Sequence, residues 1–140
     1  MKKTIETVNP VAAPASTIWS LIRTGEGVDK WFPIITSCRV EGKQRFCTTA
    51  DGELNETIVR SDDEAMVFQY SIPQQNLFPV SNILGTMTVE AVDANNCNLR
   101  WDVEFDLENE ALYDELKQGI SGLYAQGAQG LGQLASEAVA

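Results

Sequence analysis

The sequence has 140 residues, of which 44% are hydrophobic and 21% are charged, and its formal net charge is −10. This composition is typical of a soluble globular protein, and we expect residues 1–140 to form one domain. The charge disfavours nucleic acid and anionic membrane surfaces as partners, because both require clustered Lys and Arg side chains. There is no run of about 18 apolar residues, and no apolar run follows Lys2 and Lys3, so neither membrane insertion nor secretion is expected. We therefore predict an acidic cytoplasmic protein.

The residue types limit the chemistry further. The chain has no histidine, which excludes a Ser-His-Asp or Cys-His nucleophile and the usual histidine-containing metal sites. Its three cysteines, Cys38, Cys47 and Cys97, form no C-x-x-C motif, so neither a zinc ribbon nor a disulfide framework is indicated. We expect no metal and no cofactor, and any catalysis must use carboxylate, tyrosine, lysine, arginine or thiol groups.

In chain order, the first elements are a strand and two short helices. Residues 4–8 alternate like a strand, which Asn9-Pro10 should end. A short helix should begin at Pro14 and end before Thr24-Gly25, and a weaker helical turn should cover residues 26–31. The aromatic segment that follows, Trp31-Phe32-Pro33, is expected to fill the core.

The pattern then changes to the period of two that is typical of strands. Residues 37–41 and 45–49 should pair through a tight turn at Gly42-Lys43. This register places Cys38 opposite Cys47, and we expect two small buried thiols there rather than a redox pair.

Further strands are predicted at residues 54–60, 65–72, 82–92 and 98–106, joined mostly by short turns, which indicates antiparallel neighbours. Residues 98–106 have the clearest alternation. One face of that strand carries Leu99, Trp101, Val103 and Phe105, whereas the other carries Arg100, Asp102, Glu104 and Asp106. The acidic face should be solvated rather than a metal ladder.

Residues 109–138 predict one long amphipathic helix. Its apolar stripe comprises Leu112, Leu116, Ile120, Leu123, Gly127, Leu131, Leu134 and Ala138. The same segment carries Gly119, Gly122, Gly127, Gly130 and Gly132, each costing about 0.5–1 kcal/mol relative to alanine inside a helix. Any single glycine is best explained by close packing, whereas the set as a whole favours a cavity beneath the helix.

The complete order is a strand, two small helices, six strands and a long helix. It predicts an α+β fold in which a curved seven-stranded antiparallel sheet wraps around the C-terminal helix.

Several segments, in this order, resemble a known superfamily. They are residues 11–14 (VAAP) and 18–22 (IWSLI), 31–33 (WFP) and 37–41 (SCRVE), 56–59 (ETIV) and 62–64 (DDE), and 101–105 (WDVEF). The chain is similar to the START-like, helix-grip (SRPBCC) superfamily, and in particular to its polyketide cyclase / dehydrase-like branch. The resemblance covers the whole chain and implies a hydrophobic pocket between sheet and helix, but no single activity.

By position, the resemblance implies the residues that line this pocket. They are Thr36, Glu56, Phe68, Tyr70, Ile83, Gly85, Trp101, Gln126, Gly127 and Gly130. The strand alternation independently agrees with Glu56, Phe68 and Tyr70. The hormone receptors of the superfamily have a pocket lysine where this chain has Thr36, and their gate and latch sequences are absent here, so hormone reception is not implied.

Glu56 and Tyr70 are the candidate catalytic residues. A carboxylate facing the inside of a sheet loses hydration, which suits an acid, a base or a hydrogen-bond anchor. Alternatively, pairing with an arginine such as Arg60 or Arg39 would make Glu56 structural, and Tyr70 could be an ordinary core tyrosine. No second inward carboxylate is available for a paired-acid mechanism.

Three functions remain open. The first is binding or carrying a small hydrophobic or lipid-like ligand, oriented by Glu56 and Tyr70. The second is a cyclase or dehydratase in which the same pair transfers protons. The third is an interaction module whose protein partner covers Leu77 and Phe78, in a proline-bounded loop that could instead form a lid or fold back on the core. Binding is preferred because it requires only the pocket.

Overall fold

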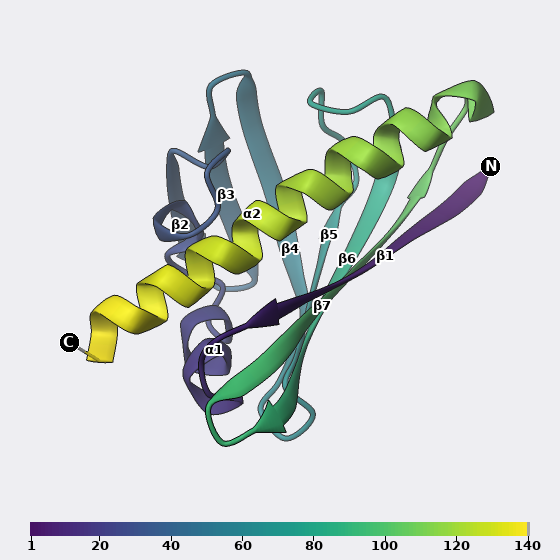
Figure 1. Cartoon of the computed structure of the whole chain (residues 1–140). Helices are drawn as coiled ribbons and strands as arrows, with labels where there is room; N and C mark the ends of the chain where they lie inside the picture. Colours follow the sequence, from purple (N-terminus) through teal and green to yellow (C-terminus); the bar gives the residue numbers. More distant parts are fainter. Residues whose placement is uncertain (140) are drawn as a thin grey trace.

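The computed structural model describes the backbone of residues 1–139 and the side chains of residues 1–137. Its centre is a seven-stranded antiparallel sheet with the order β1-β7-β6-β5-β4-β3-β2 (Figure 1). The strands are β1 (Lys2–Val11), β2 (Ser37–Glu41), β3 (Gln44–Thr49), β4 (Gly52–Asp62), β5 (Val67–Ile72), β6 (Ser81–Asp93) and β7 (Asn96–Asp106). The predicted seven-stranded antiparallel sheet is confirmed.

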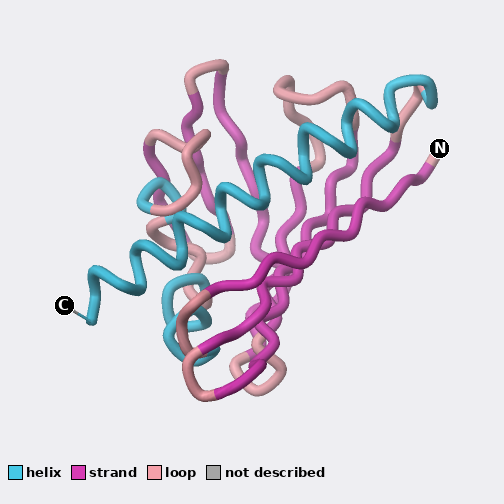
Figure 2. Tube along the Cα trace, in the orientation of Figure 1, coloured by secondary structure: helices cyan, strands magenta, loops and turns pink. Residues whose placement is uncertain are grey.

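The long helix α2 (Tyr113–Val139) crosses the inner face of the curved sheet, as Figure 2 shows. A single 3-10 turn, η2 (Glu110–Leu112), precedes it. Of the two short helices expected between β1 and β2, the first is the α-helix α1 (Ala15–Ile22), and the second is a 3-10 turn, η1 (Val28–Lys30). The fold is thus α+β, with the helices against one face of the sheet.

The β2–β3 hairpin has the predicted register. Glu41 pairs with Gln44 around a two-residue turn in which Gly42 has a φ of 61°, and Cys38 lies opposite Cys47. The two sulfurs are 3.0 Å apart and both thiols are free, with Cys47 buried and Cys38 half-buried. Cys47 donates the shared hydrogen bond, which lowers the pKa of Cys38 and raises that of Cys47.

The inner face of α2 follows the helical period, but it differs from the predicted stripe at more than one position. Leu134 is half-buried while its neighbour Ala135 is buried, and Leu112, in the turn before α2, is also half-buried. The buried residues are Leu116, Ile120, Tyr124, Gly127, Ala128, Leu131 and Ala135. Tyr124 occupies the central buried position one turn after Ile120, and Leu123 is only half-buried beside it. Ala138, the last residue of the predicted stripe, lies outside the described side chains.

The glycines of α2 do not create the cavity that the set of five suggested. A Cβ at Gly127 would touch the rings of Trp31, Phe32 and Trp101 at 3.1–3.3 Å, and one at Gly130 would overlap the main-chain carbonyl of Trp31. Both glycines allow close approach of other groups. Gly119 and Gly122 have open space around them, so they leave no internal gap.

The beginning of α2 is tied to β1. The Tyr113 hydroxyl donates a 2.8 Å hydrogen bond to the Thr4 carbonyl, and the Lys3 ammonium lies 3.2 Å from the Glu110 carboxylate. The Asn109 side chain accepts a hydrogen bond from the Ala111 amide at the start of η2. These contacts fix the helix over the sheet at the end where its first turns meet the 73–80 loop.

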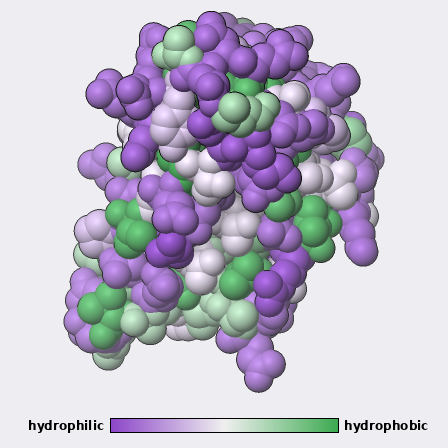
Figure 3. Space-filling model, turned by 90° about the vertical axis from the view of Figure 1, so that its right-hand side faces the viewer, coloured by the Kyte–Doolittle hydropathy of each residue, from purple (hydrophilic) through white to green (hydrophobic). Residues whose placement is uncertain are grey.

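The face of the molecule drawn in Figure 3 is mostly hydrophilic, and its hydrophobic residues lie in small separate groups. A surface of this kind gives no large apolar patch on that face. None of the helices in the described part of the chain is both long enough and apolar enough to cross a bilayer.

Candidate functional site

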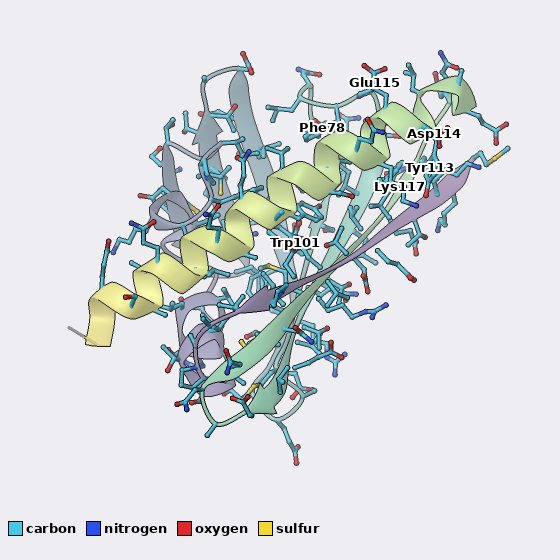
Figure 4. All side chains as sticks on the ribbon, viewed as in Figure 1. Phe78, Trp101, Tyr113, Asp114, Glu115 and Lys117 are labelled. Atoms are coloured by element: carbon cyan, nitrogen blue, oxygen red, sulfur yellow. The ribbon has the colours of Figure 1, made fainter. Side chains whose placement is uncertain are left out.

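A cavity of about 70 Å³ lies between the sheet and α2. Among its described lining residues, only Arg45, Glu56 and Gln75 have neither apolar nor aromatic side chains. The aromatic lining comprises Trp31, Phe32, Tyr70, Phe78, Trp101, Phe105 and Tyr124. Figure 4 shows Trp101 beneath the middle of α2 and Phe78 beside the first turns of the helix. A largely apolar enclosure with a few polar groups is typical of a small-molecule site.

Stacked aromatic rings form one wall of the cavity. The Trp101 and Tyr124 rings are parallel within 2°, with their centroids 3.8 Å apart. The Phe32 ring lies 5.2 Å from the Trp101 ring, and the Trp31 ring lies 5.9 Å from it. Because the rings come from β7, α2 and the segment after η1, this wall connects the sheet to both helical parts.

The polar end of the cavity is a buried ion pair. Arg45 on β3 lies directly opposite Glu56 on β4, and Arg45 Nη2 donates a 2.6 Å hydrogen bond to Glu56 Oε1. Both side chains are about 95% buried. Arg45 Nη1 also donates to the Gly25 carbonyl at 3.2 Å. Burial alone would lower the pKa of Arg45, but the charge and hydrogen bond of Glu56 outweigh it and raise that pKa.

The suggestion that Arg60 or Arg39 pairs with Glu56 was wrong. Arg39 pairs with Glu41 on the surface, and Arg60 pairs with Asp62. The β3–β4 register explains the difference, because Arg45 is the residue opposite Glu56 on the same face of the sheet.

Tyr70 lies on β5 beside this pair. Its hydroxyl accepts a 2.9 Å hydrogen bond from Trp101 Nε1. Burial, reinforced by the Glu56 charge, raises the pKa of Tyr70 to about 12. Gly85 is the residue opposite Tyr70 on β6, and any Cβ there would overlap the Tyr70 ring. The ring therefore occupies the space that a larger residue at position 85 would fill.

Of the ten residues predicted from the sequence to line the pocket, four line the cavity. Glu56, Tyr70, Ile83 and Trp101 line the cavity. Phe68 is buried below the Arg45 guanidinium, with its ring 5.2 Å away, and does not line the cavity. Gly85, Gly127 and Gly130 lie behind aromatic residues rather than at open space. Thr36 and Gln126 are exposed, and Thr36 Oγ1 donates to the Thr48 carbonyl.

Sequence reasoning missed Arg45, Tyr124 and Gln75. Each had a local signal: Arg45 shares a hairpin register with Glu56, Tyr124 follows Ile120 by one helical turn, and Gln75 lies between prolines 73 and 79. None of the three signals distinguishes a cavity residue from an ordinary core or loop residue.

The loop of residues 73–80 is held by the Gln75 side chain. Gln75 Nε2 donates to the carbonyls of Phe78 and Val80 at 2.8 and 3.0 Å, and its Oε1 accepts from the amides of Leu77 and Phe78. Leu77 and Phe78 are half-buried and pack against the core. The loop thus folds back on the molecule, which was one of the two expected arrangements.

Phe78 also borders the outside of the cavity. It lines a surface groove of about 240 Å³, together with Pro79, Leu112, Glu115, Leu116 and Gly119. Phe78 therefore lines both the inner cavity and this groove, and Figure 4 shows it near Glu115 at the start of α2.

A family model matches residues 2–136 and describes polyketide cyclase / dehydrase and lipid transport proteins. The chain belongs to this family. The match spans nearly all of both the sheet and α2, and it confirms the resemblance to the START-like, helix-grip superfamily. The comparison with curated proteins finds no significant match.

Solved structures agree on the fold. The protein XoxI from Bacillus cereus is similar with a TM-score of 0.83 and 24% identity, covering 98% of each chain. The Zhui aromatase/cyclase from Streptomyces sp. R1128 has a TM-score of 0.78 and 17% identity, covering 100% of this chain and 97% of that one. A norcoclaurine synthase from Thalictrum flavum has a TM-score of 0.75 and 16% identity, covering 100% and 98%. At these identities the likeness concerns architecture alone.

Proposed function

We propose that this protein binds a small, mainly apolar molecule in the cavity between the sheet and α2. The observation that carries the proposal is the enclosure itself, a largely apolar space with one wall of stacked aromatic rings and with the Arg45–Glu56 pair as the charged part of its described lining. The family's description, which includes lipid transport, supports the same class of function.

The size of the cavity limits what enters without rearrangement. Its volume of about 70 Å³ is smaller than the roughly 150 Å³ apolar cavity known to bind benzene in an engineered protein. A molecule with a ring therefore requires side chains to move. Phe78 is the side chain best placed to do so, because it contacts both the cavity and the outer groove. We expect entry between the 73–80 loop and the first turns of α2.

Binding accounts for the polar end better than catalysis does. Efficient general acid–base catalysis uses groups whose pKa lies near the working pH. The Tyr70 hydroxyl, with a pKa of about 12, already accepts a hydrogen bond from Trp101, and Glu56 is engaged by Arg45. A cyclase or dehydratase using Glu56 and Tyr70 is the alternative, supported by the family's name and by the Zhui aromatase/cyclase fold.

The binding proposal is tested by filling the cavity. Ethylbenzene should bind the wild-type protein, as measured by perturbed ¹H–¹³C methyl resonances of cavity residues. The variant Ile83→Phe adds a ring inside the cavity and should abolish binding, whereas Val59→Phe at a half-exposed site should leave it unchanged. Equal binding to all three proteins, or to none, would refute the proposal.

The two classes of function are separated by a second measurement. Native mass spectrometry of protein purified from its own host should detect a retained small molecule. If the protein is an enzyme, Glu56→Gln should stop conversion of that molecule while its affinity changes by less than about tenfold. If Glu56 serves binding alone, the isolated molecule is unchanged on incubation with wild-type protein, and Glu56→Gln weakens its binding.

A further inference from the structure

The three tryptophans differ in how their indole N–H groups are used. Trp19 Nε1 donates to Asp63 Oδ1 at 2.9 Å, and Trp101 Nε1 donates to the Tyr70 hydroxyl at 2.9 Å. Trp31 Nε1 is buried and, among the described residues, has no hydrogen-bond acceptor. Trp31 is 5% exposed and lines the cavity. The exception among the three indoles is thus a cavity residue.

Arg45 has the same feature. Its Nη1 and Nη2 atoms donate to Gly25 and Glu56, but its Nε atom is buried and has no acceptor within the described part of the chain. Arg45 is also 5% exposed and lines the cavity. The third buried polar atom without a hydrogen-bond partner among the described residues, Asp102 Oδ1, is an acceptor and belongs to a residue outside the cavity lining, beside Arg100.

An unpaired buried donor costs about 1–3 kcal/mol, and most buried polar groups in native proteins have partners. Indole and guanidinium N–H groups donate and cannot accept, so only an acceptor can satisfy them. These two donors belong to residues that line one cavity, so a molecule that displaces side chains on entering would gain by carrying an acceptor oxygen that reaches them.

The charges of Arg45 and Glu56 limit which oxygen-containing group a ligand can place beside them. The Arg45 guanidinium is already neutralised by Glu56 at 2.6 Å. A carboxylate would add a second buried negative charge beside Glu56, which low-dielectric surroundings penalise strongly, whereas a neutral carbonyl adds none. The chain's net charge of −10 also disfavours an anion.

We propose that the ligand is a compact neutral carbonyl compound, with its oxygen accepting from the Trp31 indole or the Arg45 guanidinium and its apolar body against the aromatic wall. This inference rests on the proposed binding function and adds the chemical class that the site prefers.

The test compares two probes of nearly equal shape, acetophenone and ethylbenzene. Acetophenone should bind about fivefold more tightly, because a single net hydrogen bond inside a protein contributes about 1 kcal/mol. In ¹H–¹⁵N spectra, acetophenone should move the Trp31 indole resonance downfield and ethylbenzene should not. The resonance is assigned by its loss in Trp31→Phe.

Two variants separate the contributions. Trp31→Phe keeps an aromatic ring but removes the donor. The ratio of acetophenone affinity to ethylbenzene affinity should therefore fall, because the enlarged cavity affects both probes alike and the lost hydrogen bond affects acetophenone alone. Trp19→Phe is the matched control, because its indole already bonds Asp63 outside the cavity, and the preference should be unchanged. Arg45→Lys, which retains the charge but lacks Nε, should also reduce the preference.

The outcomes distinguish the two proposals. If both probes bind with equal affinity and acetophenone shifts the Trp31 indole resonance no more than ethylbenzene does, the cavity binds apolar molecules but the carbonyl inference is overturned. If neither probe binds, the proposed binding function fails, and the inference fails with it.

Discussion

The pair Gly130→Ala and Gly122→Ala tests how α2 is seated over the cavity. Both glycines lie inside α2, and each change adds one methyl group. At Gly122 the methyl would have no neighbour within 4 Å. At Gly130 it would overlap the main-chain oxygen and carbon of Trp31, which cannot rotate away as a side chain would.

The structure therefore predicts effects of opposite sign. Alanine is more favourable than glycine inside a helix by about 0.5–1 kcal/mol, and Gly122→Ala should gain this amount. At Gly130 the same gain is outweighed by overpacking, which costs typically about 1–3 kcal/mol and here falls on backbone, so we expect a net loss of about 1–2 kcal/mol. With an unfolding entropy of about 2.1 cal/mol/K per residue, 140 residues give about 3 °C per kcal/mol.

Urea unfolding followed by circular dichroism, together with calorimetry, measures both changes. Gly122→Ala should raise Tm by about 2–3 °C, and Gly130→Ala should lower it by about 3–6 °C. Equal stabilisation by both would show that α2 does not approach the Trp31 backbone closely. In that case Trp31 would not lie against α2, and the cavity would lack the aromatic wall to which this residue contributes.

Two further predictions concern the Tyr70 ring and the Asp63 carboxylate. Gly85→Ala should displace the Tyr70 ring and lower the free energy of unfolding by about 1–3 kcal/mol, measured by urea unfolding. A variant as stable as the wild type would contradict the close contact between Gly85 and the ring. Asp63 is held at a pKa of about 2 by Arg23 and by Trp19, below its usual 3.8. The resulting stabilisation should be complete above about pH 5 and lost as the pH falls from about 4 to 2. The stability difference between the wild type and Asp63→Asn should shrink over that window, and a constant difference would refute the assignment.

Strand positions were predictable because alternation is a local property. Residues 98–106 alternate inward and outward in the structure as the sequence indicated. The end of β1 was not predicted correctly, since Asn9-Pro10 looked like a terminator while β1 continues to Val11. β1 is an edge strand, and a proline on an edge strand loses no ladder hydrogen bond if its nitrogen faces outward.

The glycines show where sequence reasoning ends. Their spacing predicts that Gly119, Gly127 and Gly130 lie on or beside the inner face of α2. The structure bears this out for Gly127 and Gly130, whereas Gly119 is exposed and has open space around it. The spacing does not say what lies opposite, because Trp31 and Phe32 are about a hundred residues away in the chain. Missing side chains are compatible with either a gap or a close neighbour, and only the tertiary packing decides between them.

The Arg45–Glu56 pair places two charges in a largely apolar and aromatic interior. Burying two charges costs about as much as their attraction returns, and replacing such pairs by apolar residues is often neutral or stabilising by about 1–4 kcal/mol. We therefore expect the double variant Arg45→Met, Glu56→Leu to be at least as stable as the wild type in urea, whereas Arg45→Met alone should lose about 3–5 kcal/mol by leaving Glu56 unpaired. If the double variant is stable but no longer prefers acetophenone, the pair serves the ligand. If it is as unstable as the single variant, the pair holds β3 against β4, and its role is structural.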